Sequence, residues 1–308
     1  ERVSDNFNND FPARMSDGRF MTNYWPNCAL NTSIQGEMNS YVYRQFLTNN
    51  ASSLMTNMNK IHKAEYGCDT CFPEIKINPQ SRYVQECTVK NFTKILDSAG
   101  VTYGVLSNEQ CSGDPANKLG DKLTYQLLMD QNVEELNKVK NVTTMCPHCV
   151  VNLQKEYSKY HEIKYEVKHH TQVISELLEQ GKIDINPGSL EKVTYHDPCN
   201  LSRTLDEVSA PRNAIKAAAP EFFELEESGK ETLCCGAGGA LWWKKDSGEG
   251  RTHLLRAEQV IESKTDTVVT GCNFCYGMMN QGVGPLTPAG QEPIKVKDVA
   301  DIVAENLS

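Results

Sequence analysis

The chain has 308 residues, of which 39% are hydrophobic and 23% are charged, so it can bury real cores and lacks the composition of a disordered protein. Its 40 acidic and 31 basic side chains give a formal net charge of -9, which argues against nucleic acid or an anionic membrane surface as the main partner. No stretch approaches the ~18 apolar residues that span a bilayer, and the polar first residues do not resemble a signal peptide. We therefore expect a cytoplasmic protein of two domains or of one duplicated domain.

Residues 1–65 contain no motif to which a mechanism can be assigned, and they are interpreted as an N-terminal extension of unknown role. Within this extension, residues 41–54 place Tyr43, Phe46, Leu47 and Leu54 near one face of a helix. The extension is therefore predicted to be mostly irregular or helical.

From residue 66 onward, short β-type runs alternate with amphipathic segments, which is the pattern of a parallel α/β sheet. The predicted strands cover residues 101–106, 142–145, 165–168, 192–195, 222–225, 267–270 and 294–296. The predicted helices cover residues 82–98, 123–138, 172–179, 212–218 and 252–262. Cys146, Cys199 and Cys272 each follow a predicted strand, and ligands bind at the carboxyl ends of strands in such sheets.

The 12 cysteines are better explained by metal or redox chemistry than by disulfides, because a chain of this length can fold without them and no export signal is present. Five of them lie in the C-terminal half: Cys199, Cys234, Cys235, Cys272 and Cys275. Five thiolates are one more than a tetrahedral zinc ion or a cubane iron–sulfur cluster uses. The adjacent pair requires a turn, for which the flexible backbone comes from Gly236, Gly238 and Gly239.

A weaker version of the same pattern occurs upstream, which predicts an internal duplication. Cys111 and Ser112 stand where Cys234 and Cys235 stand, and Cys146 and Cys149 correspond to the last pair of the complete pattern. The predicted division is a first, degenerate repeat over residues 66–190 and a second, complete repeat over residues 191–308. Either Cys68 or Cys71 is the counterpart of Cys199, and the sequence does not decide between them.

The cysteine pattern resembles the cysteine-rich CCG domain of heterodisulfide reductases and related iron–sulfur oxidoreductases over residues 66–308. Further strings that carry the resemblance are Cys146-Pro147-His148-Cys149, His169-His170-Thr171, Tyr195-His196-Asp197-Pro198-Cys199 and Cys234-Cys235-Gly236-Ala237-Gly238-Gly239. The resemblance implies two tandem CCG-type repeats, each a small parallel-sheet α/β unit. It also implies a noncubane [4Fe-4S] cluster held by the five cysteines of the second repeat. In the first repeat, Ser112 replaces a ligand, so Cys111, Cys146 and Cys149 with Cys68 or Cys71 hold a second, cubane cluster or none.

His196 and Arg212 flank the complete motif and are the predicted catalytic residues. His196 would deliver a proton to a nascent thiolate or donate a hydrogen bond to a cluster sulfur, and a structural role is the alternative. Arg212 would hold an anionic substrate, or would serve only the start of its helix.

The predicted function is that of an iron–sulfur oxidoreductase component, which transfers electrons to or from a thiol/disulfide or a flavoprotein/quinone chain. The sequence lacks a ferredoxin cysteine run, a dinucleotide fingerprint and a membrane span, so a flavoprotein, ferredoxin-like or membrane subunit is the expected partner. Such a partner would also explain an association with the membrane. The alternatives are a non-catalytic electron-relay or scaffold protein and a zinc-binding interaction protein.

Overall fold

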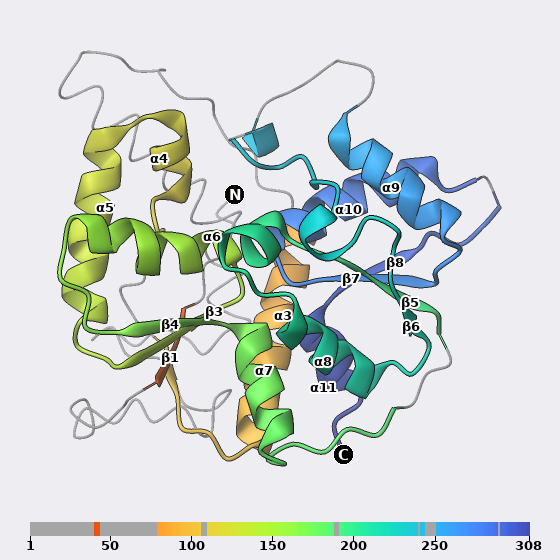
Figure 1. Cartoon of the computed structure of the whole chain (residues 1–308), viewed down its shortest axis with the longest axis horizontal. Coiled ribbons are helices and arrows are strands. Elements are labelled where there is room, and N and C mark those ends of the chain that lie inside the picture. The colour runs from red at the N-terminus through yellow and green to blue at the C-terminus, as the bar shows by residue number, and fades with distance from the viewer. Residues whose placement is uncertain are drawn as a thin grey trace.

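Two four-stranded parallel sheets form the framework of the chain (Figure 1). The computed structural model describes residues 40–43, 79–105, 110–187, 191–239, 241–243, 251–288 and 290–308. The first sheet has the order β2-β1-β3-β4 and the second has the order β6-β5-β7-β8. Their strands are β1 (Ser40–Tyr43), β2 (Gly104–Val105), β3 (Asn141–Thr144), β4 (Glu166–His169), β5 (Val193–His196), β6 (Phe222–Phe223), β7 (Thr267–Thr270) and β8 (Lys295–Asp298). The identical order confirms that the chain is a duplication of one α/β unit.

The helices fill the connections between these parallel strands, as crossover connections require. They are α3 (Pro79–Ser98), α4 (Asp114–Leu119), α5 (Lys122–Leu136), α6 (Pro147–Val150), α7 (His170–Glu179), α8 (Ser209–Ala218), α9 (Thr252–Glu262), α10 (Asn273–Leu286) and α11 (Val299–Glu305). Short π- and 3-10-helical turns occupy η3 (Val151–Glu156), η4 (Tyr157–Lys159), η5 (Asn200–Thr204), η6 (Gly229–Glu231) and η7 (Leu241–Trp243). All five helices predicted from the sequence over residues 82–262 are present, with ends that differ by a few residues.

The central strands of the second sheet are covered on both faces. Every residue of β5 and β7 is buried, which fits their β-branched and aromatic sequences, Val-Thr-Tyr-His and Thr-Val-Val-Thr. Strands β3, β4 and β8 instead alternate, with an exposed first residue, a half-buried third residue, and buried second and last residues. The carboxyl ends of the strands therefore lead into the protein interior.

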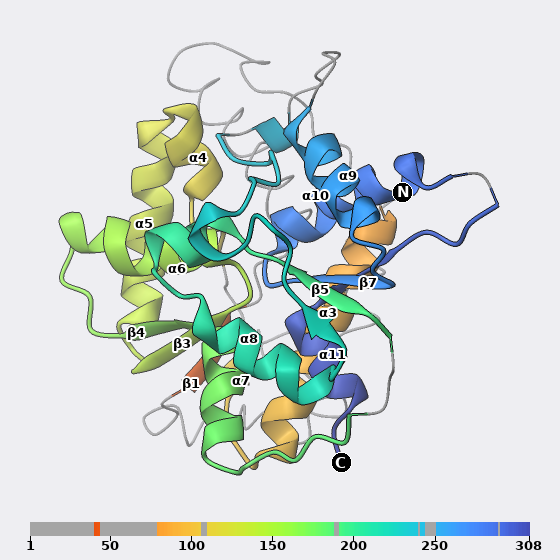
Figure 2. The ribbon, with the colours of Figure 1, turned by 45° about the vertical axis from the view of Figure 1, so that its right-hand side comes forward.

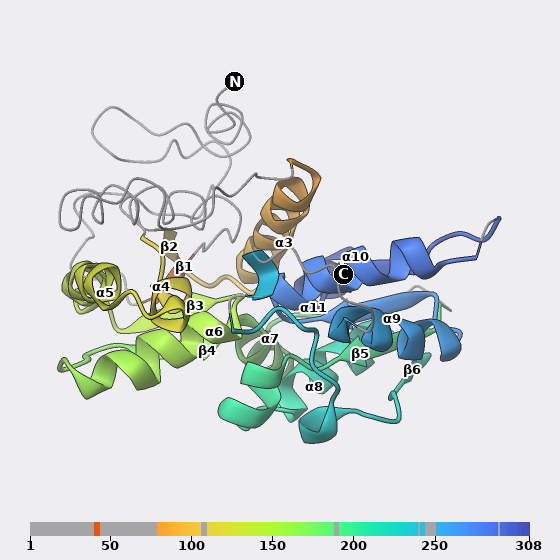
Figure 3. The same ribbon diagram turned by 90° about the horizontal axis from the view of Figure 1, so that it is seen from above.

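One helical layer joins the two repeats. Helix α3 packs against α11, and α7 packs against α8, so each pair takes one helix from each repeat (Figure 1). The helices α4 and α5 lie beside the first sheet and α9 and α10 lie beside the second, as the turned views also show (Figures 2 and 3). The buried cysteines belong to the core that includes α5, α9 and α10, and not to the core of the shared layer.

A buried polar network strengthens the shared layer. Nε2 of His170, at the start of α7, lies 2.8 Å from Oδ1 of Asp298, the N-cap of α11. Burial lowers the pKa of His170 to about 3 and raises the pKa of Asp298 to about 7, so the pair favours its neutral forms. Thr88 and Asn91 of α3 donate hydrogen bonds to Asp301 of α11. Because these groups are buried, the network fixes the register of the two repeats.

The prediction of a helix beginning at residue 41 is wrong. Residues Ser40–Tyr43 form strand β1, which lies between β2 and β3 and pairs in parallel with both. Tyr41, Val42 and Tyr43 are aromatic or β-branched residues, which favour strands, and pairing on both sides outweighs the weak helical periodicity. The first sheet thus includes a strand from the segment that was interpreted as an extension. The rest of the predicted helix, residues 44–54, lies outside the described residues.

The close contact between α9 and α10 gives a test of the packing. A methyl group added at Gly282 of α10 would lie 2.6 Å from Cβ of Ala257 and 2.9 Å from the carbonyl oxygen of His253, both on α9. We expect Gly282→Ala to lower the free energy of unfolding by about 1–3 kcal/mol, because the helices must separate. The matched control is Gly284→Ala in the same helix, where the methyl group meets nothing within 4 Å. It should change the free energy of unfolding by less than about 1 kcal/mol, because helix propensity favours alanine while Pro285 disfavours a Cβ on the residue before it. Chemical denaturation of both variants measures the difference, and equal effects would contradict this packing.

Candidate iron–sulfur site

The two Cys-x-x-Cys segments are built in the same way at the ends of β3 and β7. Cys146 caps α6 and Cys272 caps α10, both with extended backbones. The second cysteine of each segment, Cys149 or Cys275, lies in the first turn of the helix that follows. Both sulfur atoms of a segment are therefore held at a helix start, and at the longer helix α10 the helix dipole favours thiolates.

The two turns that carry Cys111 and Cys234 are also equivalent. Gly113 and Gly236 have positive φ angles of 75° and 81°. Their backbone N–H groups donate to the sulfur atoms of Cys111 at 3.4 Å and of Cys234 at 3.3 Å. Ser112 therefore occupies the place that Cys235 occupies in the second repeat. Its hydroxyl donates a hydrogen bond to the sulfur of Cys149 at 3.4 Å. In the second repeat, Cys235 and Cys275 are the corresponding interacting pair.

The structure brings together all five cysteines that the sequence assigned to the second repeat. Neighbouring side chains in this set lie close enough to shift one another's pKa values, in the pairs Cys199 with Cys234, Cys234 with Cys235, Cys235 with Cys275, and Cys275 with Cys272. Three of these cysteines are buried, while Cys199 and Cys234 are partly exposed. The set thus has a buried side and one edge that solvent can reach.

The thiols of this set cannot all ionise by themselves. Hydrogen bonds from Cys199 and Cys235 lower the pKa of Cys234 to about 2. The same interactions, together with burial, raise the pKa values of Cys199 and Cys235, and burial raises that of Cys275. Cys234 is therefore the thiol of this set that ionises, and its neighbours stabilise its thiolate. A second thiolate beside it would be repelled, because the surroundings are of low polarity. A bound cationic metal or an iron–sulfur core would remove this conflict, since thiolates are the ligands of both.

His196, at the end of β5, faces the buried side of the set. Its ring nitrogen lies within 4.8 Å of the sulfur atoms of Cys235 and Cys275. Burial lowers the pKa of His196 to about 3, so the ring is neutral at pH 7. Its Nε2 atom is buried and has no hydrogen-bond partner among the described residues. A cluster in this site, whose sulfurs accept hydrogen bonds, would offer a partner to a proton on this nitrogen.

Arg212 is held entirely by protein groups. Its guanidinium forms two hydrogen bonds with Asp197, at 2.8 and 2.9 Å, and two with Glu224, at 2.7 and 2.9 Å, and it also donates to the carbonyl oxygen of Val208. These five hydrogen bonds use the five N–H groups of an arginine. The geometry therefore favours the structural alternative for Arg212, and its role toward an anionic substrate stays a prediction.

The first repeat contributes fewer thiols. Cys111, Cys146 and Cys149 are buried near one another, and Cys146 also contacts Cys272 of the second repeat. The ring nitrogen of His148 lies 3.8 Å from the sulfur of Cys146 and 3.9 Å from that of Cys272, so the two cysteine sets adjoin each other.

Strand register relates the two repeats residue by residue as far as the ends of β1 and β5. Strand β1 pairs with β3 as β5 pairs with β7, so Tyr43 corresponds to His196. Cys68 and Cys71 lie outside the described residues, so the choice of either one as the counterpart of Cys199 stays a prediction.

Arg256 of α9 is a further residue of the site, and the sequence pattern did not single it out. It is fully buried, and its Nε donates to Nδ1 of His196 at 3.1 Å. An arginine within an amphipathic helix usually faces solvent, so no sequence signal marked it.

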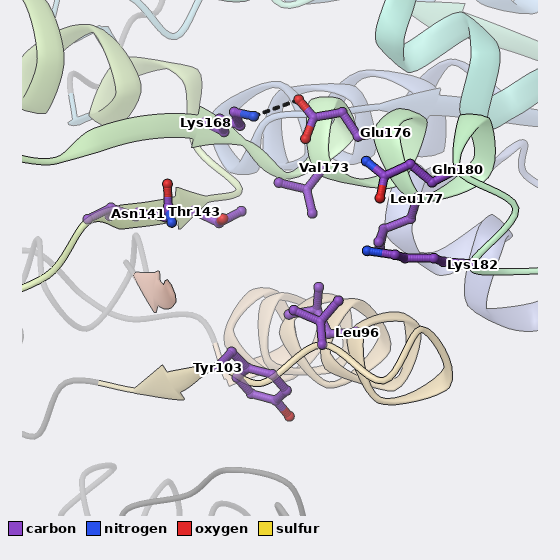
Figure 4. A pocket seen from close by; sticks show the side chains of 12 residues that line it. Leu96, Tyr103, Asn141, Thr143, Lys168, Val173, Glu176, Leu177, Gln180 and Lys182 are labelled. Atoms are coloured by element: carbon purple, nitrogen blue, oxygen red, sulfur yellow. Dashed lines mark hydrogen bonds and ion pairs between the residues drawn. The ribbon is translucent and has the colours of Figure 1, made fainter. Parts of the chain in front are cut away.

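A cavity of about 250 Å³ lies elsewhere in the protein (Figure 4). Its lining includes Asn141 and Thr143 of β3, Leu96 of α3, and the ion pair between Lys168 and Glu176, whose atoms are 2.7 Å apart. Residues of β3 line the cavity, whereas Cys146 follows the end of that strand. The cavity is therefore separate from the cysteine site.

The turn at Cys234 and Cys235 can be tested through its glycine. A methyl group on Gly236 would lie 3.2 Å from Cβ of Thr252 and 3.3 Å from the backbone nitrogen of His253, and its positive φ angle would be strained. We expect Gly236→Ala to displace the two sulfur atoms and to lower the iron content of protein purified without oxygen. Gly239→Ala is the control, because Gly239 has a similar φ angle of +62° but open space around it. Equal iron loss in both variants would show that the shape of this turn is not what holds the metal.

Comparison with known proteins identifies the family. The model of the CCG cysteine-rich domain matches twice, at residues 77–154 and 193–280. A protein of Chromohalobacter salexigens named "Probable membrane-anchored ferredoxin" is 37% identical over 71% of this chain and 33% of its own length. The EtfAB:quinone oxidoreductase of Syntrophomonas wolfei is 35% identical over 68% of this chain and 30% of its own length.

A third relative connects the chain with heterodisulfide reductases. One component of the dihydromethanophenazine:CoB–CoM heterodisulfide reductase of Methanosarcina barkeri is 28% identical over 70% of this chain and 54% of its own length. The chain spans about a third of the length of the first two relatives. The repeated cysteine turns, the repeated sheets and the two matched segments lead to one conclusion: this chain belongs to the CCG cysteine-rich domain family.

Proposed function

We propose that the five cysteines of the second repeat hold one noncubane [4Fe-4S] cluster and that the chain transfers electrons through it within a larger redox protein. The observation that carries the proposal is the convergence of five thiols, of which three are buried and two lie at a partly exposed edge. The relatives named as a quinone oxidoreductase and as part of a heterodisulfide reductase support a redox role.

The number of thiols supports the noncubane type. A cubane cluster uses four thiolates and a zinc ion uses four ligands, so either would leave one of the five thiols unused in a crowded, buried set. When bound, such a cluster supplies the capacity to accept and release single electrons. The chain's own contribution is to hold the thiolates, to exclude water on the side of Cys235, Cys272 and Cys275, and to donate the Gly236 amide to Cys234.

We place a single cluster in the described part of the chain. The described part of the first repeat offers Cys111, Cys146 and Cys149, one thiol fewer than a cubane needs, and Ser112 stands where the complete repeat has Cys235. A fourth thiol from Cys68 or Cys71 would be required for a second cluster.

Electrons would enter or leave at the edge formed by Cys199 and Cys234, because these are the partly exposed ligands. A relay needs only this edge and a partner that docks on it. The EtfAB:quinone and membrane-anchored relatives suggest a flavoprotein or membrane protein as that partner. Among the described residues, none of the helices combines the length and the apolar character that a membrane crossing requires.

Reductive cleavage of a disulfide is the second candidate, and the same exposed edge favours it. A disulfide that reached Cys199 and Cys234 would take up two electrons and two protons and leave as two thiols. His196 is poorly placed to supply those protons, since it is buried behind Cys235 and Cys275. The geometry therefore supports the relay more strongly. If the isolated chain reduced a heterodisulfide with a reduced dye as electron donor, disulfide cleavage would be favoured over the electron relay.

Replacement of the extra ligand tests the cluster assignment. Cys235→Ser reproduces in the second repeat the change that Ser112 represents in the first. We expect it to abolish the cluster or to convert it to a cubane type, visible in iron and sulfide analysis and in the electron paramagnetic resonance spectrum of protein purified without oxygen. Cys111→Ser, at the equivalent buried turn, should leave the iron content and the spectrum unchanged. An unaltered spectrum in Cys235→Ser would rule out the five-cysteine site, and iron loss in Cys111→Ser would contradict a single cluster.

A further inference from the structure

Arg256 is a buried cation that has no counter-charge of its own among the described residues. Its side chain is fully buried and is among the largest side chains to be so. Within the described part of the chain, no carboxylate forms an ion pair with it, whereas Arg212 has both Asp197 and Glu224. A buried charge is normally paired, so the balancing negative charge for Arg256 should come from another source.

The hydrogen bonds of Arg256 all end on neutral groups. Nε donates to Nδ1 of His196 at 3.1 Å, Nη1 donates to Oε1 of Gln259 at 2.7 Å, and Nη2 donates to the hydroxyl oxygen of Thr232 at 3.2 Å. The negative groups that attract it from a longer distance are Asp197, Glu227 and Cys275. Asp197 is already engaged by Arg212, and Glu227 is exposed to solvent, which weakens its effect, so the cysteine site is the remaining direction in which a strong counter-charge can develop.

The contact with His196 fixes which ring nitrogen carries the proton. A guanidinium has donors only, so Nδ1 of His196 must accept, and the ring proton of the neutral imidazole must be on Nε2. That N–H is the group with no partner among the described residues, and the ring faces the sulfur atoms of Cys235 and Cys275. Arg256 thereby keeps the ring proton of His196 on Nε2, from which it can be donated to a sulfur.

We propose that Arg256 is a positioning residue that sets the reduction potential of the cluster, by orienting the His196 N–H at the sulfur ligands and by offsetting negative charge with its guanidinium. The inference rests on the proposed function, because it needs a cluster in the second repeat. Uptake of one electron adds one negative charge at the site, while Arg256 stays cationic and His196 keeps its single proton. Nearby positive charge and hydrogen bonds to sulfur both favour the reduced state.

The first repeat lacks this arrangement. Tyr43 stands at the register position of His196, and α5, which precedes β3 as α9 precedes β7, contains no arginine. The buried cation is therefore associated with the five-cysteine set and not with the fold in general.

Redox titration of the full chain, purified without oxygen and monitored by electron paramagnetic resonance, tests the inference. Arg256→Met and His196→Leu should each lower the midpoint potential, with at least a tenfold smaller ratio of reduced to oxidised cluster at a given potential, or about 59 mV for one electron. Arg256→Lys keeps the charge without the planar fork and should shift the potential less than Arg256→Met. Electron–nuclear double resonance should show an exchangeable proton near the cluster that is lost in His196→Leu and altered in Arg256→Met.

The control is Asp301→Ala, which removes a buried polar group of the α3–α11 contact far from the sulfurs and should destabilise the protein without moving the potential. If Arg256→Met fails to fold, Arg256→Lys and His196→Leu decide the question. Wild-type potentials and an unchanged exchangeable proton in the loaded variants would overturn the role of Arg256. Absence of iron and sulfide from the wild-type chain would instead overturn the proposed function, so the two failures can be distinguished.

Discussion

Mutual repulsion between buried thiolates is the constraint on which the site depends. Five cysteines are held so closely that one of them, Cys234, ionises easily while its neighbours resist ionisation. Such a set is costly in an empty protein and favourable around a cationic metal–sulfide core, since the core supplies the missing positive charge. The fold brings the cysteines together at the carboxyl ends of parallel strands, where each Cys-x-x-Cys segment also begins a helix. Glycine at the tight turns lets backbone amides approach the sulfurs as additional donors.

The duplication explains how the two repeats are held together and how their cysteine sets come to differ. The layer formed by α3, α7, α8 and α11 joins the repeats, and the buried contacts of His170 with Asp298 and of α3 with Asp301 fix how they pack. The two cysteine sets consequently meet at Cys146, His148 and Cys272. Only the second repeat has the full set of five thiols together with the buried pair of His196 and Arg256. Both repeats thus have the same arrangement of strands, while the complete five-cysteine pattern is present in the second repeat.

The sequence predicted the parallel α/β architecture because it depends on local patterns, whereas the cluster ligands stay a prediction. Alternating hydrophobic periods identified β3, β5, β7 and α9 closely, and the repeated cysteine spacing identified residues that the structure brings into contact. Strand β1 was missed because Ser40–Tyr43 is stabilised by pairing with β2 and β3, which are distant in sequence. The role of Arg256 was equally hidden, since its burial and its contact with His196 arise from how α9 packs on β5 and not from the helix itself.

The central claim is that five cysteines of one repeat hold a single iron–sulfur cluster. The most direct measurement is Mössbauer spectroscopy of the full chain produced with ⁵⁷Fe and purified without oxygen, combined with iron and sulfide analysis. The account predicts about four iron and about four sulfide per chain, as one [4Fe-4S] cluster, in a spectrum that differs from that of a cubane because of the fifth thiolate. A colourless protein that contains zinc without iron, or a spectrum of an ordinary cubane with one cysteine free to react with a thiol reagent, would contradict it.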